Sequence, residues 1–183
     1  MRTKLFLASG LAALSAVASA QTGSLAGTLG IYYPSIGEIK NLIGSQFLTY
    51  GVSLWGGNST SNGISPQLDF IEGSGNGNTF LLVPLTYGYE KDFTSSLTTG
   101  TRGTGVNFIP YVRAGVGICY FDYNITNGYD YSTQRLGGTG NIEAGLKISN
   151  SAKIFARYNW FTPEQGFNFS GLEIGVVLSL FKV

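Results

Sequence analysis

Apolar and polar residues alternate along most of this chain, and the alternation is clearest in its last third. Within residues 141–148 every even position is apolar, while the odd positions carry Asn, Glu, Gly and Lys. Residues 153–160 and 171–181 repeat the period of two, again with an apolar even face. A period of two places alternate side chains on opposite faces of a β-strand. The pattern therefore predicts three strands here, each with one apolar face.

Five further strands are expected upstream, separated by breaks rich in Gly, Asn, Ser and Thr. One begins at Tyr111 and continues to Phe121, and another covers residues 79–90. The remaining three are expected at 24–33, 46–55 and 66–72, of which the last is short. Eight such strands in chain order predict an all-β, antiparallel, up-and-down barrel.

One short helix is expected in the first connection between strands. Isoleucine recurs at helical spacing within residues 36–43. Ser35 and Glu38 have the spacing of a capping box, and Gly44 can end the helix. We expect an amphipathic turn whose apolar side packs on the rim of the barrel; a lid over a ligand is the alternative.

The first twenty residues have the features of a secretory signal peptide. Two basic residues precede an apolar run from Leu5 to Val17, and Ala18-Ser19-Ala20 offers small residues for cleavage. We therefore expect a signal peptide at 1–20 and one barrel domain at 21–183. An uncleaved membrane anchor is the alternative, disfavoured because the apolar run is short for spanning a bilayer.

Composition narrows the possible functions. Charged residues make up 11% of the chain against 43% hydrophobic ones, the formal net charge is +1, and there are one cysteine and no histidine. These counts disfavour a basic nucleic-acid face, histidine-dependent nucleophiles and histidine-ligated or multi-cysteine metal sites. A lipid-modifying barrel enzyme would need a site without histidine. We therefore expect no enzyme activity, no cofactor, no metal and no nucleic-acid partner.

Two features indicate that the apolar face of the strands meets lipid. The polar faces are rich in glycine, as a narrow lumen requires where backbone and side chains approach closely: Gly51, Gly88, Gly115, Gly117, Gly145 and Gly175. The ends of the apolar stripes carry aromatic residues suited to the bilayer surface: Tyr33, Tyr89, Tyr120, Tyr158 and Trp160. A soluble secreted lipocalin-like binding barrel, with the apolar face as its core, is the alternative.

Short motifs also carry a family resemblance. Residues 110–117, Pro-Tyr-Val-Arg-Ala-Gly-Val-Gly, resemble the P-Y-V-x-A-G-x-G strand of small bacterial outer-membrane β-barrels of the outer-membrane protein A/W type. Residues 31–44 are similar to the same group, and residues 171–183 are similar to its insertion signal, although Lys182 and Val183 follow Phe181 where that signal ends on an aromatic residue. The resemblance implies a location in the cell outer membrane, contact with outer-membrane lipid and insertion by the barrel-assembly machinery. We expect a monomer.

Charged side chains on the polar faces form the candidate site. They are Arg113, Glu143, Lys147, Lys153, Arg157 and Glu173. Pairing residue 148 with 152 across the turn at 149–151 places Glu143 opposite Arg157. A matching register on either side brings Arg113 toward Glu143 and Glu173 toward Arg157. Because an unpaired buried charge is costly, we interpret this alternation as a structural ladder that fills the lumen. A gate or proton path is the alternative.

The sequence thus predicts an eight-stranded transmembrane β-barrel with a short helix in its first loop and a side-chain-filled lumen. Its expected role is structural or surface-interaction, and a narrow porin-like barrel for small or apolar solutes is the alternative. The connections expected to face outward are 34–45, 73–78, 122–139 and 162–170. Those expected to face the periplasm are 56–65, 91–106 and 149–151, the second of which is long and is expected to contain a hairpin around Thr99-Gly100.

Overall fold

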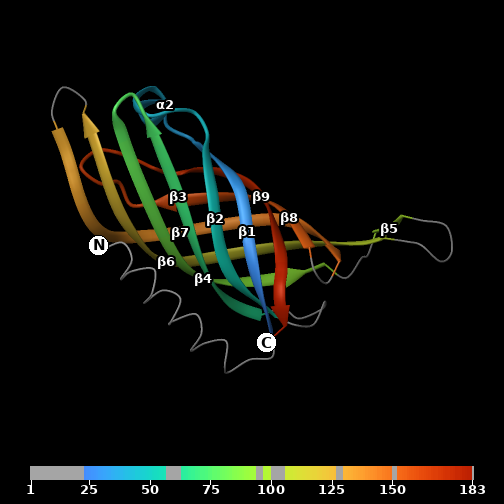
Figure 1. Ribbon diagram of the computed structural model, residues 1–183. Coiled ribbons are helices and arrows are strands. Elements are labelled where there is room, and N and C mark those ends of the chain that lie inside the picture. Colours follow the sequence, from blue (N-terminus) through green and yellow to red (C-terminus); the bar gives the residue numbers. More distant parts are fainter. Residues whose placement is uncertain are drawn as a thin grey trace.

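The computed structural model describes residues 23–56, 63–93, 97–99, 106–126, 130–149 and 152–182. The predicted signal peptide at 1–20 lies outside these residues. The strands are β1 (Gly23–Pro34), β2 (Phe47–Gly56), β3 (Gly63–Gly75), β4 (Asn78–Asp92), β5 (Leu97–Thr99), β6 (Val106–Thr126), β7 (Asp130–Ser149), β8 (Ala152–Phe161) and β9 (Gly171–Lys182). The helix α2 (Gly37–Leu42) follows β1 (Figure 1).

Eight of these strands close into an antiparallel ring. Each pairs with its neighbours in chain order, β4 pairs with β6, and β9 returns to pair with β1. The short strand β5 pairs with the start of β6 and lies outside this ring. The predicted eight-stranded up-and-down barrel is therefore confirmed.

The register of the ring sets the width of the lumen. Steps from partner to partner, starting at Tyr111 of β6, pass in turn through Gly145, Phe155, Gly175, Gly30, Thr49, Ile71 and Leu82. The path returns to β6 at Phe121, ten residues beyond its start. Such a stagger tilts the strands against the barrel axis, and eight strands enclose a space that side chains can fill.

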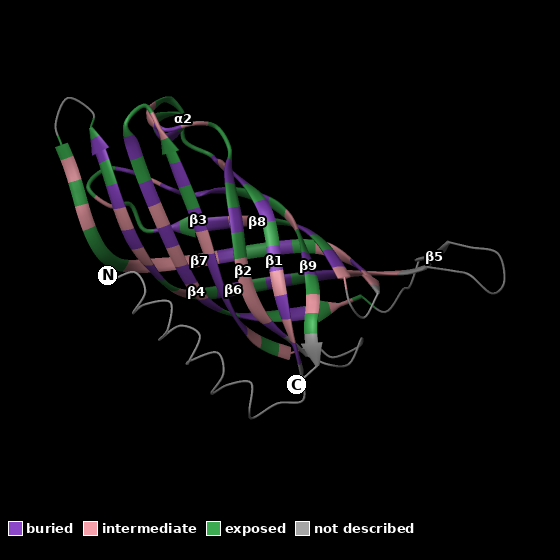
Figure 2. Ribbon diagram, viewed as in Figure 1, coloured by how far each residue is buried: buried purple, intermediate pink, exposed green. Residues whose placement is uncertain are grey.

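Burial alternates along the strands as the sequence predicts (Figure 2). On β6 the side chains of Val112, Ala114 and Val116 are exposed on the outer surface, whereas Tyr111 and Arg113 are buried inside. Because the apolar face points away from the lumen, this barrel is inverted relative to a soluble one.

The expected bounds of three segments are wrong. β3 covers Gly63–Gly75 rather than 66–72. β6 and β7 continue to Thr126 and from Asp130, so the predicted loop at 122–139 is mostly paired strand. In this extension both faces of β7 carry polar residues, so the sequence lacks the alternation that marks the rest of the barrel.

The first loop contains the predicted helix, but its capping differs from the prediction. The N-cap is Ile36, which makes no side-chain cap hydrogen bond. Ser35 instead donates its backbone N–H to the carbonyl oxygen of Ser170 at 2.9 Å, which extends the pairing of β1 with β9. Ile39 is buried whereas Ile36 is exposed. Gly44, with φ of 152°, follows the helix as expected.

The hairpin expected around Thr99-Gly100 is confirmed in part. β5 pairs with the start of β6, with Leu97 opposite Phe108 and Thr99 opposite Val106, so Thr99 lies within a strand, and the connection at 100–105 lies outside the described residues. Among the described residues, no helix is long and apolar enough to cross a lipid bilayer.

Candidate functional site: the barrel lumen

The predicted charge ladder has the expected register. Arg113 is the cross-strand partner of Glu143, Glu143 of Arg157, and Arg157 of Glu173. All four side chains are buried inside the barrel. The predicted pairing of residue 148 with residue 152 is wrong, because an irregularity after Lys147 makes residue 149 the partner of residue 152. The irregularity leaves the pairing of Glu143 with Arg157 unchanged, since it lies on the turn side of this pair.

Arg157 is the centre of the ladder and is completely buried. Its Nη2 donates to Glu173 Oε1 at 2.9 Å, and its Nη1 donates to Asp69 Oδ2 at 3.0 Å. Its Nε lies 3.6 Å from Glu143 Oε2. Three carboxylates from three different strands therefore surround one guanidinium, and the attraction offsets the cost of removing these charges from water.

Neutral groups complete the hydrogen bonding of these carboxylates. Thr49 donates to Glu173 Oε1 at 2.8 Å, and Asn159 donates to Oε2 of the same residue at 3.0 Å. Tyr111 donates its hydroxyl hydrogen to Glu143 Oε1 at 2.7 Å. A buried polar network is stabilising when its members are satisfied, as most of these are.

The guanidinium of Arg113 donates hydrogen bonds to groups other than Glu143, its cross-strand partner. Its Nη1 donates to Asn141 Oδ1 at 3.1 Å, and its Nη2 donates to the carbonyl oxygen of Ser65 at 3.3 Å. A Cβ atom on Gly88 would overlap the guanidinium of Arg113. Gly88 therefore provides the space for this side chain, as expected of glycine on the lumen side.

Lys147 and Lys153 are direct cross-strand partners, so two like charges face each other. Glu90 lies between them, with its carboxylate oxygens 2.8 Å from Lys147 Nζ and 2.7 Å from Lys153 Nζ. Asp92 approaches Lys147 Nζ at 2.6 Å. The ring of Tyr111 lies 4.9 Å from Lys153 Nζ, in position for a cation–π contact. Acidic residues of β4 thus balance the two lysines across the lumen.

Three members of this site were missed by the sequence analysis: Asp69, Glu90 and Asp92. The six predicted residues comprise four cations and two carboxylates, which is an imbalance that buried charge does not tolerate. That imbalance is a signal for further acids on the opposite strands. We define the charge network as Asp69, Glu90, Asp92, Arg113, Glu143, Lys147, Lys153, Arg157 and Glu173.

Towards the α2 end, the lumen is filled by apolar side chains. We define the aromatic cluster as Tyr32, Phe47, Phe80, Phe121, Tyr123, Phe161, Phe167 and Phe169. The rings of Phe121 and Phe161 are 6.0 Å apart and nearly perpendicular, a favourable edge-to-face geometry. Tyr32 donates its hydroxyl hydrogen to the backbone carbonyl of Phe169. The lumen face is therefore polar in one half of the barrel and apolar in the other.

Helix α2 and the segment 162–170 bring further side chains to the aromatic cluster. Ile39 and Ile43 are buried against it from the first loop. The buried Cys119 also belongs to this cluster. Within the described part of the chain, no group of three acidic, cysteine or histidine side chains could hold a metal ion.

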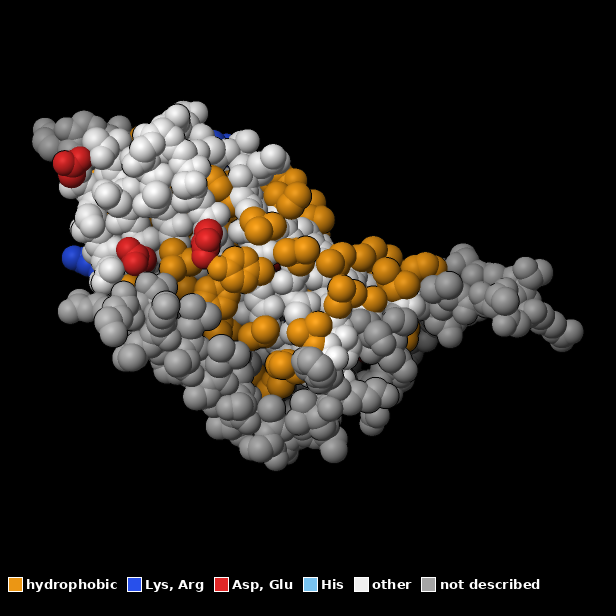
Figure 3. Space-filling model, in the orientation of Figure 1, with side chains coloured by type: hydrophobic (Ala, Val, Ile, Leu, Met, Phe, Trp, Pro, Cys, Tyr) orange, Lys and Arg blue, Asp and Glu red, His pale blue; other side chains and the backbone are white. Residues whose placement is uncertain are grey.

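The outer surface carries an apolar belt around the barrel. Val116 is 72% exposed, and the belt includes residues of all eight ring strands, among them Leu29, Leu48, Ile64, Tyr87, Val116, Ile142, Ile154 and Ile174. Figure 3 shows hydrophobic side chains as a band across the visible face, with the visible charged groups gathered towards the end that carries the β6–β7 hairpin.

No family model matches this chain, and no curated protein matches it in sequence. Solved structures that are similar in shape include three β-barrels of outer-membrane proteins. Neisserial surface protein A gives a TM-score of 0.47 with 14% identity over 86% of this chain and 96% of that one. The N-terminal β-barrel domain of Pseudomonas aeruginosa OprF gives 0.46 with 21% identity over 87% and 98%. The outer membrane enzyme PagL gives 0.47 with 14% identity over 86% and 99%.

Proposed function

We propose that this chain is an outer-membrane β-barrel with a closed, side-chain-filled lumen and a structural or surface-interaction role. The observation that carries this proposal is the inversion of the barrel. Nine charged side chains fill one half of the interior, while the exposed outer face is apolar. A bilayer accepts this arrangement, since lipid covers the apolar face and no backbone group of a closed ring is left without a partner.

The proposed orientation puts the α2 end outside the cell. The β6–β7 hairpin extends beyond the apolar belt at this end, and its outer face presents polar side chains such as Asn124, Thr126 and Ser132. Arg135 is also exposed here and pairs with Glu164 at 3.8 Å. Polar surface beyond the belt supports contact with water or a partner rather than with lipid.

The lumen supports a structural role better than transport. The charge network and the aromatic cluster occupy successive levels, so a solute would have to displace both. The interior also disfavours a lipocalin-like barrel, because a large apolar ligand would have to replace paired charges. The proposed role requires no catalytic group.

Cell fractionation together with electrophoresis of boiled and unboiled samples tests the location. We expect the protein in the outer-membrane fraction, resistant to salt washing, with a compact unboiled form that migrates differently. Recovery as a soluble periplasmic or secreted protein would refute the proposal. A planar-bilayer recording tests the closed lumen, for which we expect no steady conductance. Stable channels would favour the porin-like alternative.

A further inference from the structure

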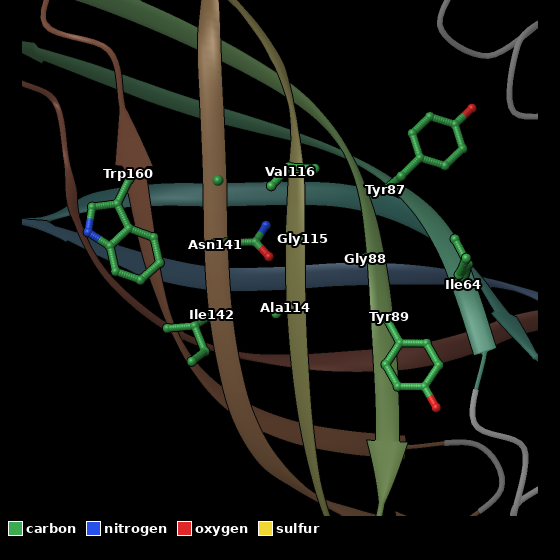
Figure 4. Close-up of a pocket in the computed structure, with 11 residues that line it drawn as sticks. Ile64, Tyr87, Gly88, Tyr89, Ala114, Gly115, Val116, Asn141, Ile142 and Trp160 are labelled. Atoms are coloured by element: carbon green, nitrogen blue, oxygen red, sulfur yellow. The ribbon is translucent and has the colours of Figure 1, made fainter.

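A groove of 580 Å³ lies on the outer surface of the barrel, over β4, β6 and β7. Ala114 of β6 lies at its floor (Figure 4), and Gly140 of β7 also lines it. The small methyl group of Ala114 and the absence of a side chain on Gly140 leave the backbone of these two strands accessible. Tyr87 and Tyr89 of β4 form one wall, and Trp160 of β8 stands at the far side. The lining is almost entirely apolar, so the groove offers hydrocarbon contacts and very few hydrogen bonds.

The groove runs across the strands because small outward-facing residues lie in register with large ones on the neighbouring strands. Tyr87, Val116, Gly140 and Trp160 are successive cross-strand partners on one row, and all face outward. The small residue Gly140 therefore lies between the bulkier Val116 and Trp160. On the next row Ala114 lies in the same way between Tyr89 and Ile142. The depression is thus bounded on both rows by large side chains.

A positive charge lies next to one end of the groove. Lys91 follows Tyr89 by two residues on β4, so it projects from the same outer face, and it is exposed. None of the ion pairs between described residues involves Lys91. It belongs to the end of the barrel opposite α2, which the proposed function places at the periplasmic surface.

We propose that this surface binds one anionic phospholipid of the periplasmic leaflet, with an acyl chain in the groove and the phosphate at Lys91. This inference rests on the proposed membrane location. Within a bilayer an apolar hollow fills with hydrocarbon, since water finds no partners there and an empty space loses van der Waals contacts. A lysine at the edge of the belt attracts the negative headgroup of the same molecule, and its aliphatic stem packs on apolar surface.

Native mass spectrometry of the full barrel, released from vesicles of equal parts phosphatidylglycerol and phosphatidylcholine, tests the inference. We expect one retained phospholipid, enriched in phosphatidylglycerol. Lys91→Gln should reduce this enrichment to the composition of the vesicle. Ala114→Leu should fill the groove and lower the retained fraction several-fold. The matched controls are Lys40→Gln, an exposed lysine on α2, and Ala156→Leu, an exposed outer-face alanine of β8 outside the groove; both should behave as the parent.

Equal lipid retention by the Ala114→Leu and Ala156→Leu variants would contradict the binding of an acyl chain in the groove. Unchanged selectivity for phosphatidylglycerol in Lys91→Gln would contradict the contact between the phosphate and Lys91. Retention of a second protein copy in place of lipid would also overturn the proposal. Insertion into the vesicles is measured separately by the mobility of unboiled samples. A barrel that inserts but retains no lipid contradicts only this inference, whereas failure to insert contradicts the proposed function.

Discussion

The two halves of the lumen are filled in different ways. In the charge network, each long side chain meets a specific partner on another strand, as Arg157 meets Glu173 and Asp69 at 2.9 and 3.0 Å. In the aromatic cluster, rings such as Phe80 and Phe169 pack at 5.5 Å without a directional bond. The first kind of filling depends on charge pairing and strand register, whereas the second depends on volume. The difference predicts that a substitution that conserves side-chain size costs much more stability in the charge network than in the aromatic cluster.

The largest effect is expected at the centre of the charge network. Arg157→Met keeps a long side chain but leaves Asp69, Glu143 and Glu173 buried without their shared cation. Loss of one partner of a buried ion pair costs about 3–5 kcal/mol. Urea unfolding of the protein in lipid vesicles should show a loss of this size in the free energy of unfolding.

A double-mutant cycle with Glu143→Gln tests whether the loss comes from the pairing. The Glu143→Gln and Arg157→Met double variant should lose less than the sum of the single variants, because it contains fewer orphan charges. Additive losses would contradict the coupling of these two residues. A new conductance in Arg157→Met would show that the network also closes a passage.

The next effect concerns the apolar outer face of the barrel. Val116 is exposed on the apolar belt, and Val116→Arg would place a charge in hydrocarbon. We expect a cost of about 2–4 kcal/mol near the middle of the bilayer. Ala144→Arg, also on the outer face, should behave similarly. If both variants fold into vesicles as well as the parent, these residues do not face lipid.

A smaller effect is expected in the aromatic cluster. Leu82, the cross-strand partner of Phe121, is completely buried among these rings, and Leu82→Met changes the shape of its side chain at nearly constant volume and leaves no polar group without a partner. Volume-conserving apolar exchanges usually cost less than about 1.5 kcal/mol. The same vesicle unfolding assay measures this loss, which should be well below that of Arg157→Met. A larger loss than in Arg157→Met would reverse the comparison between the two halves.

The contrast between the charge network and the aromatic cluster also explains which parts of the structure could be predicted from the sequence. Strand identity and the register of Glu143 with Arg157 were predictable, because their hairpin has a short turn and regular alternation on both strands. The contacts of Asp69 with Arg157 and of Glu90 with Lys153 were not, because β3 and β4 are far from the β7–β8 hairpin in the chain and meet β8 only across the closed lumen.

The aromatic cluster was missed for a different reason. Near the start of β4, successive residues from Phe80 to Val83 are all apolar, so both faces of the strand look alike and no period is visible. Phe167 and Phe169 lie in a segment expected to be a loop, and their burial depends on the folding of 162–170 towards the lumen. The charge network shows in the sequence as an alternation of charges on neighbouring strands, whereas apolar filling produces no such signal.

The smallest effect should come from the one ion pair at the rim of the barrel among those described. Arg135 and Glu164 have the same chemistry as Arg157 and Glu173, but their nitrogen and oxygen atoms are 3.8 Å apart and the Arg135 side chain is 57% exposed. Water solvates the exposed guanidinium of Arg135, so the net contribution of this pair is about 0–1 kcal/mol and falls as salt concentration rises. Arg135→Gln should therefore change the free energy of unfolding in vesicles by less than about 0.5 kcal/mol. The change should shrink further in high salt, whereas the loss in Arg157→Met should persist, because salt hardly screens a buried pair. Equal salt dependence of the two variants would mean that water and ions reach Arg157, and the charge network would then be a wet passage rather than a dry filling.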